Sequence, residues 1–121
     1  MKLVVNTTLA ASIVVLGEAL SLGQALGLDQ GPVLDVLAES PVGPTVKAKR
    51  ANVETGRYPP SFKLSLAAKD MRLAVDAAHE AGRDLRTAET VRRWLDDAAA
   101  QGAADQDFSA VVATILGVAP P

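Results

Sequence analysis

The chain has 121 residues, of which 49% are hydrophobic and only 3% aromatic, and its formal net charge at pH 7 is −2. This composition excludes a disordered chain, and the slightly acidic balance gives no electrostatic footprint for nucleic acid. Cysteine is absent, which excludes disulfide scaffolds, thiolate nucleophiles and cysteine-ligated zinc. His79 is the single histidine, so we predict no multi-histidine metal site and no metal.

The N-terminal apolar segment favours a buried helix over a signal peptide or a membrane span. Lys2 followed by an apolar run superficially resembles a secretory signal peptide. Asn6 interrupts that run, Glu18 follows it, and the apolar pattern continues to Leu28 without stopping at a cleavage site. Recurring polar residues also weaken a membrane span, so we expect no membrane partner.

Residues 2 to about 27 predict one long helix, because no proline interrupts them and small residues alternate with leucine and valine. The segment is apolar nearly all round, which is typical of a helix buried inside an assembly. Gly27 is expected to cap its C-terminal end, and Asp29 to cap a second helix that ends before Pro41.

Further helices are expected along the rest of the chain. Residues 44–55 predict a short helix between stretches punctuated by proline and glycine. Ser61 is expected to cap a helix that reaches Ala81, and the last two helices are expected at 87–101 and 107–116. No segment alternates with period two, so we predict an all-α fold. Residues 1–121 would form one domain, a helical bundle built around the long N-terminal helix.

Apolar periodicity indicates which helix faces are buried. In the helix after Ser61, one inward stripe is predicted at Leu66, Leu73 and Ala77, widened by Ala67, Met71, Ala74 and Ala78. Trp94 and Phe108 occupy apolar helix positions and are predicted to lie in the core.

Two pairs of polar residues are candidates for chemistry. Lys2 and Asn6 are four residues apart and project from one helix face, where an amine and a carboxamide can hold a hydroxyl or carboxylate. A lysine amine beside a cofactor can also act as a general acid or base. The alternative is that Lys2 is simply a solvated residue at a helix start.

The second pair is Lys69 and Asp70, which falls near the predicted inward stripe. A charged pair there is unusual unless it is partnered or lies at a cleft. The alternative is a surface salt-bridge set in which Arg72 pairs with Asp76.

Other polar residues are given structural interpretations. The cations at Lys47, Lys49 and Arg50 are expected to form a solvated face, and His79 is expected to be exposed. No glycine-rich phosphate-binding loop occurs in the sequence, so the chain alone offers no cradle for a nucleotide.

Three segments, in their order and spacing, carry a resemblance to a known family. They are KLVVN at 2–6 leading into LSLGQALGLD at 20–29, FKLSLAAKDMRLA at 62–74, and QDFSAV at 106–111. The whole chain resembles the C-terminal helical domain of the β-hydroxyacid dehydrogenases. This family includes 3-hydroxyisobutyrate, tartronate semialdehyde and 6-phosphogluconate dehydrogenases.

The resemblance implies an oxidoreductase parent. Family members carry an N-terminal Rossmann domain that binds NAD or NADP, and that half is absent here. The chain is therefore expected to be an excised or truncated substrate-side and dimerisation domain, inactive alone. The parent would transfer a hydride between a nicotinamide cofactor and a small β-hydroxyacid resembling 3-hydroxyisobutyrate, or a related 2-hydroxyacid.

By the same resemblance, Lys2 looks like the catalytic lysine and Asn6 like the substrate-orienting asparagine. Lys69 looks like the lysine that reaches the cofactor, with Asp70 and Phe62 near it. At Val5, relatives often carry a second asparagine. A homodimer or higher oligomer and a cytoplasmic location are expected. The alternatives are a non-catalytic helical oligomerisation module and an imine-reductase-like relative, although imine reductases usually replace the catalytic lysine.

Overall fold

The computed structural model describes residues 1–118 as a set of helices, and residues 119–121 of the expected domain lie outside the described residues. The main helices are α1 (Lys2–Ala25), α2 (Gln30–Leu37), α3 (Gly43–Thr55), α4 (Leu64–Glu80), α5 (Arg86–Ala98) and α6 (Val111–Leu116). A wide helical turn at Ala99–Ala103 follows α5, and a 3₁₀ turn at Phe108–Ala110 precedes α6. Within residues 1–118 no strand forms, and the predicted all-α class is confirmed.

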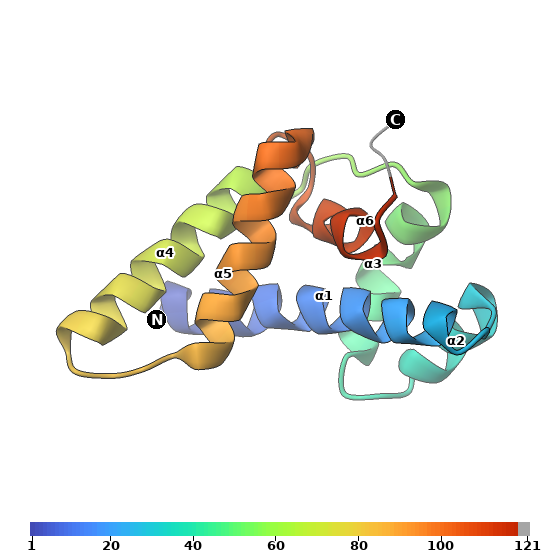
Figure 1. Ribbon diagram of the computed structural model, residues 1–121, viewed down its shortest axis with the longest axis horizontal. Coiled ribbons are helices and arrows are strands. Elements are labelled where there is room, and N and C mark those ends of the chain that lie inside the picture. Colours follow the sequence, from blue (N-terminus) through green and yellow to red (C-terminus); the bar gives the residue numbers. More distant parts are fainter. Residues whose placement is uncertain (119–121) are drawn as a thin grey trace.

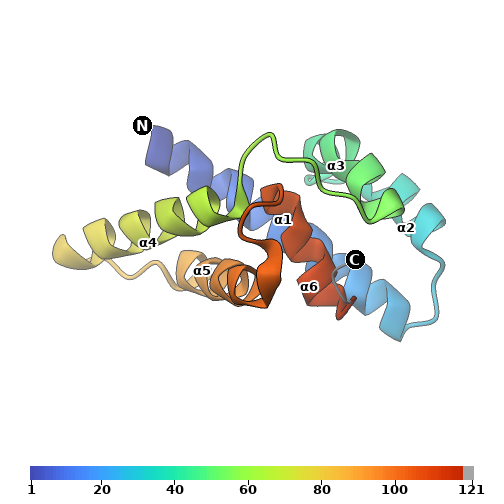
Figure 2. The same cartoon turned by 90° about the horizontal axis from the view of Figure 1, so that it is seen from above.

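The long helix α1 is the centre of the bundle, as predicted. It contacts every other α-helix (Figure 1). Seen from above, α4 and α5 lie side by side across its N-terminal half, whereas α6 packs farther along it (Figure 2). The segments that carry Lys2 and Lys69 therefore lie at the same end of the molecule.

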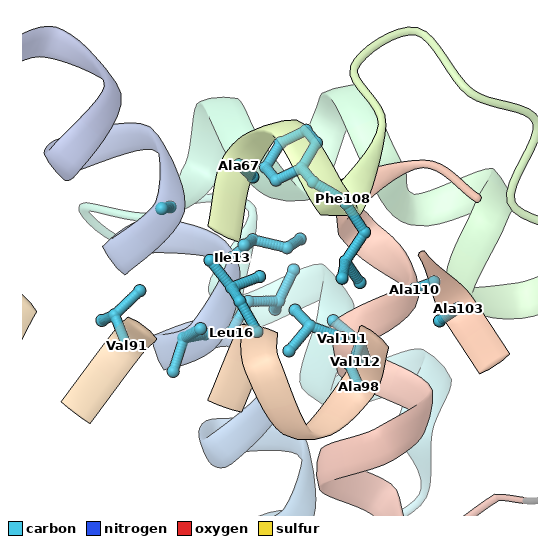
Figure 3. Packing of buried hydrophobic residues seen from close by; sticks show 14 of the residues in the cluster. Ile13, Leu16, Ala67, Val91, Ala98, Ala103, Phe108, Ala110, Val111 and Val112 are labelled. Carbon is cyan, nitrogen blue, oxygen red and sulfur yellow. The ribbon is translucent and has the colours of Figure 1, made fainter. Parts of the chain in front are cut away.

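The core is almost entirely aliphatic, as the composition requires. Figure 3 shows Ile13 and Leu16 of α1 pointing toward Val111 and Val112 of α6. Phe108 is the one large aromatic ring in this core among the described residues, at 3% exposure, and its predicted burial is confirmed. Trp94 is only half-buried, and its Nε1 donates a hydrogen bond to Glu18 at 3.0 Å. The prediction that Trp94 lies in the core holds only in part: the side chain packs against the core, but its polar nitrogen keeps one edge at the surface.

The turn between α1 and α2 follows the predicted capping pattern in part. Gly27 adopts a left-handed φ of 76°, and its N–H donates to the carbonyl of Gln24 while that of Leu28 donates to Gly23. This pair of hydrogen bonds closes the end of α1 as expected for a glycine cap. Asp29 precedes α2 in an extended conformation, but its side chain makes no capping hydrogen bond.

Three helix boundaries differ from the prediction. Lys63, and not Ser61, is the residue before α4, because the Ser61 hydroxyl donates to Asp107 instead. The helix expected at 87–101 ends regularly at Ala98 and widens before Gly102, whose φ is 105°. The helix expected at 107–116 opens with the 3₁₀ turn.

The buried face of α4 is the alanine stripe and not the leucine stripe. Leu66 and Leu73 are 49% and 47% exposed, whereas Ala67, Met71 and Ala74 are buried. Small alanine side chains let α1 and α5 approach α4 closely, so the predicted stripe through Leu66, Leu73 and Ala77 was wrong.

One face of α1 remains uncovered within the single chain, and its expected burial inside an assembly stays a prediction. Val4, Val15 and Leu22 are about half exposed or more. Among residues 1–118, α1 is the one helix that is long and apolar enough, by length and composition, to cross a membrane, with a mean hydropathy of 1.8. Its other face packs against α4, α5 and α6, so the core accounts for the apolar residues on that face only.

Candidate functional site

The structure joins two of the predicted site residues directly. The Asn6 carboxamide nitrogen donates a hydrogen bond of 2.8 Å to Oδ2 of Asp70, and both side chains are half-buried. The two residues are 64 positions apart in the sequence. Asn6 lies in the second turn of α1 and Asp70 near the end of the second turn of α4, so the packing of α1 against α4 creates the pair.

Two lysines flank this pair, and both are exposed. Lys2 is the first residue of α1 and lies one turn before Asn6, on the same helix face. Lys69 adjoins Asp70 in the sequence. Among residues 1–118, neither ammonium group makes an ion pair or a side-chain hydrogen bond, so each is available to a ligand.

Apolar side chains surround the polar pair. Leu9 follows Asn6 by three residues, and Leu66 and Leu73 lie four residues before and three after Asp70. All three are exposed. The site is therefore a short polar strip with two cations at an open surface that has an apolar rim.

Phe62 belongs to a different cluster from the other predicted site residues. It lies two positions before α4, half-buried, with its ring centroid 5.6 Å from that of Phe108. Its backbone N–H donates to Oδ1 of Asp107 at 3.1 Å. The contacts of Phe62 therefore group it with the C-terminal segment and not with the Asn6–Asp70 pair.

Asp107 is a buried charged residue that sequence reasoning did not single out. Its side chain is fully buried, and it forms a salt bridge of 3.0 Å with Lys49. Burial alone would raise the pKa of Asp107, but hydrogen bonds from Ser109, Lys49 and the backbone of residues 61 and 62 outweigh it and hold the pKa well below its ordinary value. The sequence did contain a pattern that could have indicated this role. In the segment Asp107-Phe108-Ser109, an aspartate can cap a turn, and the Asp107 side chain indeed accepts a hydrogen bond from the Ser109 N–H.

The cations expected to form a solvated face are mostly paired. Lys49 is only 14% exposed and pairs with Asp107, and Arg50 pairs with Asp35 at 2.6 Å and Glu54 at 3.0 Å. The expectation was wrong for Lys49, because its partner comes from the far end of the chain. Lys47 is exposed as predicted.

Two further polar predictions have definite outcomes. Arg72 pairs with Asp96 of α5 at 2.9 Å and not with Asp76, so the interpretation as an Arg72–Asp76 pair within α4 was wrong. The approach of α5 to α4 offers Arg72 a carboxylate from another helix. His79 is exposed, as predicted.

Comparison with known proteins places this geometry in a family. Residues 1–115 match the family model described as the NAD-binding domain of NADP-dependent 3-hydroxyisobutyrate dehydrogenase. The chain belongs to this family. The matched residues include both the Asn6–Asp70 pair and the hydrogen-bonded cluster around Asp107.

Relatives of this chain include named enzymes and one nuclear protein. Glyoxylate/succinic semialdehyde reductase 1 of Arabidopsis thaliana is 32% identical over 95% of this chain, and the chloroplastic reductase 2 is 31% identical over 93%. The human cytokine-like nuclear factor N-PAC is 29% identical over 92% of this chain. The chain spans only 40%, 32% and 20% of these three proteins, respectively.

Solved structures with the same helical arrangement include two 3-hydroxyisobutyrate dehydrogenases. The protein from Salmonella typhimurium has a TM-score of 0.85 at 23% identity, over 93% of this chain and 40% of that chain, which shows the fold. The protein from Mycobacterium tuberculosis, in a structure with L-serine, has a TM-score of 0.80 at 26% identity, over 94% of this chain and 42% of that chain.

Proposed function

We propose that this chain is the substrate-side helical domain of an NAD(P)-dependent dehydrogenase that acts on small hydroxyacids. The observation that carries the proposal is the hydrogen bond between Asn6 and Asp70, with Lys2, which has no ion-pair partner among residues 1–118, one turn before Asn6. The relatives named as hydroxyacid dehydrogenases and aldehyde-acid reductases support the same class of reaction. Membership in this class predicts a substrate with a hydroxyl or carbonyl near a carboxylate.

The residues of this chain have separate roles in the proposal. In the oxidation direction the Lys2 amine accepts the proton of the substrate hydroxyl, and in reduction the Lys2 ammonium returns a proton to the carbonyl oxygen. Asn6 orients the substrate through its carboxamide, and the Asp70 carboxylate fixes the carboxamide by accepting from its nitrogen. That bond leaves the Asn6 carbonyl oxygen free to accept from the substrate.

The open surface is suited to a nicotinamide cofactor held mainly by another domain. A bound nicotinamide supplies the hydride acceptor or donor. Lys69 is exposed beside Asp70 and makes no ion pair within the described part of the chain, so its ammonium can reach an anionic dinucleotide. The apolar rim formed by Leu66 and Leu73 provides surface against which a second domain can pack.

The test is a fusion of this chain behind the nucleotide-binding domain of a family member. Hydride transfer is followed by nicotinamide absorbance with 3-hydroxyisobutyrate, L-serine, glyoxylate and succinic semialdehyde as substrates. Lys2→Ala should lower kcat by about 100- to 10,000-fold, the usual contribution of a general acid or base. Lys47→Ala removes an exposed lysine of α3 and serves as the matched control. Equal turnover of the wild-type fusion and Lys2→Ala would refute the assigned role.

A non-catalytic assembly module is the second candidate, and two observations favour it. The nuclear factor N-PAC matches nearly the whole chain under a name that denotes no enzyme. In addition, Val4, Val15 and Leu22 lie on one uncovered face of α1, at helical spacing, and the exposed Leu26 follows directly after the helix. Such a face is suited to pairing with a second copy.

Sedimentation equilibrium of the isolated chain tests this second candidate. Leu22→Glu should shift the chain toward monomer, because it places a charge in the apolar stripe. Val36→Glu makes the same change at an exposed position on α2 and is the control. A wild-type chain that stays monomeric at high concentration would remove the support for assembly. A wild-type fusion that is folded and loaded with cofactor but inactive on all four substrates would leave assembly as the better account.

A further inference from the structure

The two carboxylate oxygens of Asp107 are divided between two parts of the chain. Oδ1 accepts hydrogen bonds from the backbone N–H groups of Ser61 and Phe62, each at 3.1 Å, and from the Ser61 hydroxyl at 3.0 Å. Oδ2 accepts from the N–H and hydroxyl of Ser109 and pairs with the Lys49 ammonium at 3.0 Å. One oxygen therefore holds the segment before α4, and the other holds α3 and the C-terminal turn.

The segment held by Oδ1 is also attached by the Asp107 N–H, which donates to the carbonyl of Tyr58 at 3.0 Å, and by the Lys49 ammonium, which donates to the Ser61 hydroxyl at 3.2 Å. Pro59 and Pro60 have no backbone N–H, so the next two amides, those of Ser61 and Phe62, are the first donors available after them. Both amides go to Asp107. Neighbouring backbone hydrogen bonds from Phe108 to Phe62 and from Leu64 to Gln106, at 2.7 Å and 2.9 Å, align the same two stretches.

The negative charge of Asp107 is required for this arrangement. All the groups that face the carboxylate are donors: two hydroxyls, three amides and one ammonium. A carboxylate without these partners would be costly to bury, and an amide in its place would turn a donor toward donors. Lys49 supplies the counter-charge, and its ammonium also lies 5.0 Å from the centre of the Phe108 ring.

We infer that Asp107, paired with Lys49, is a positioning residue for Phe62 and for the start of α4, and through them for the candidate site. The part that concerns catalysis rests on the proposed function, whereas the position of Phe62 does not. Asp70 follows the start of α4 by six residues, about 9 Å along a helix. A shift of the anchored segment is therefore transmitted to Lys69 and Asp70 by a rigid helix of fewer than two turns.

Phe62 can be observed directly, because the chain contains only two phenylalanines. Protein labelled with 4-fluorophenylalanine gives two ¹⁹F resonances, which Phe62→Leu assigns. In Asp107→Asn the Phe62 resonance should broaden or move toward its position in urea-unfolded protein, at temperatures where circular dichroism still shows native helix content. Asp97→Asn, at an exposed carboxylate of α5 that makes no ion pair among residues 1–118, should leave it unchanged.

A second variant keeps the inference testable if Asp107→Asn does not fold. Lys49→Met removes the counter-charge and keeps the carboxylate, and it should also displace the Phe62 resonance. Ser109→Ala removes one donor from Oδ2 and the acceptor of the Asn52 carboxamide, but it keeps every contact of Oδ1, so it should displace the resonance less. A native Phe62 resonance in folded Asp107→Asn, or in folded Lys49→Met if the first variant does not fold, would overturn the inference.

The fusion enzyme separates this inference from the proposed function. Asp107→Asn should raise the KM for the hydroxyacid several-fold more than it lowers kcat, whereas Lys2→Ala should act mainly on kcat. A wild-type fusion that binds cofactor but has no turnover refutes the proposed function alone. The ¹⁹F measurement on the isolated chain then still decides whether Asp107 positions Phe62.

Discussion

Gly43 offers the sharpest test of the packing between α2 and α3. A Cβ atom added at Gly43 would lie 2.3 Å from the carbonyl oxygen of Ala38 and 3.1 Å from its carbonyl carbon. Both are backbone atoms in the turn after α2, so a rotamer change cannot relieve the clash. Gly43→Ala therefore has to displace backbone that leads into the helix carrying Lys49 and Asn52.

The expected cost follows from the size of that displacement. Real Cβ contacts essentially never fall below 3.0 Å, so the two segments must separate by at least several tenths of an ångström. Overpacking that moves backbone costs about 1–3 kcal/mol, and we expect about 2–3 kcal/mol here because no flexible atom can give way. For a domain of this length, that corresponds to a fall in Tm of roughly 8–12 °C.

Gly31→Ala is the matched control. Gly31 is also near the start of a helix, α2, but an added Cβ there meets no atom within 4 Å. Gly31→Ala should leave the free energy of unfolding unchanged or raise it by up to about 1 kcal/mol, because alanine has the higher helix propensity. Urea unfolding followed by circular dichroism measures both variants. A Gly43→Ala protein within about 0.5 kcal/mol of the wild type, the usual range for neutral surface substitutions, would refute the steric argument.

Three further predictions concern stability. The pKa of Asp107 in the folded protein lies below the pKa of an aspartate in the unfolded chain, which is about 3.9. The stabilising effect of the carboxylate is therefore fully present above about pH 4 and is lost as the pH falls toward the folded pKa. Urea midpoints between pH 6 and pH 2 should show this loss, and Asp107→Asn should flatten it; an equally steep loss in the variant would contradict the assignment. Leu16→Ala, at a fully buried position of α1, should cost about 2–5 kcal/mol, whereas Leu22→Ala on the exposed face should cost less than half as much in a dilute monomer. Trp94→Phe removes the exposed hydrogen bond to Glu18 and should cost about 1 kcal/mol or less in thermal unfolding, with Glu18→Gln as the comparison.

The helices were largely predictable from the sequence because their ends are marked locally. Glycine at positions 27 and 82 adopts left-handed backbone at the ends of α1 and α4, where the pattern expected a stop. The N-terminal boundary of α4 was not predictable in the same way. A serine after two prolines is a good local cap, but the Ser61 hydroxyl is taken by a carboxylate 46 residues away.

The buried faces of the helices and the side-chain pairs between helices were less predictable, because both depend on which helix lies alongside. Periodicity gave α4 two adjacent apolar stripes, and only the packing of α1 and α5 selects the alanine stripe over Leu66 and Leu73. In the sequence, Lys49 cannot be distinguished from a solvated lysine, because its partner Asp107 comes near only when α3 packs against the C-terminal turn. Spacing marks Asn6 and Asp70 only as members of two separate pairs. The family resemblance is what assigns both residues to one site.

The long-range contacts of Asp107 have a consequence for the order in which the protein folds. Lys49, Ser61 and Asp107 are far apart along the chain, so their meeting closes long loops, which slows folding relative to local helix formation. During synthesis, α1 to α4 emerge well before the residue that secures the Phe62 segment. A nascent chain can therefore form α1 to α4 before the anchor of the Phe62 segment exists, and that segment is secured only once Asp107 has been synthesised.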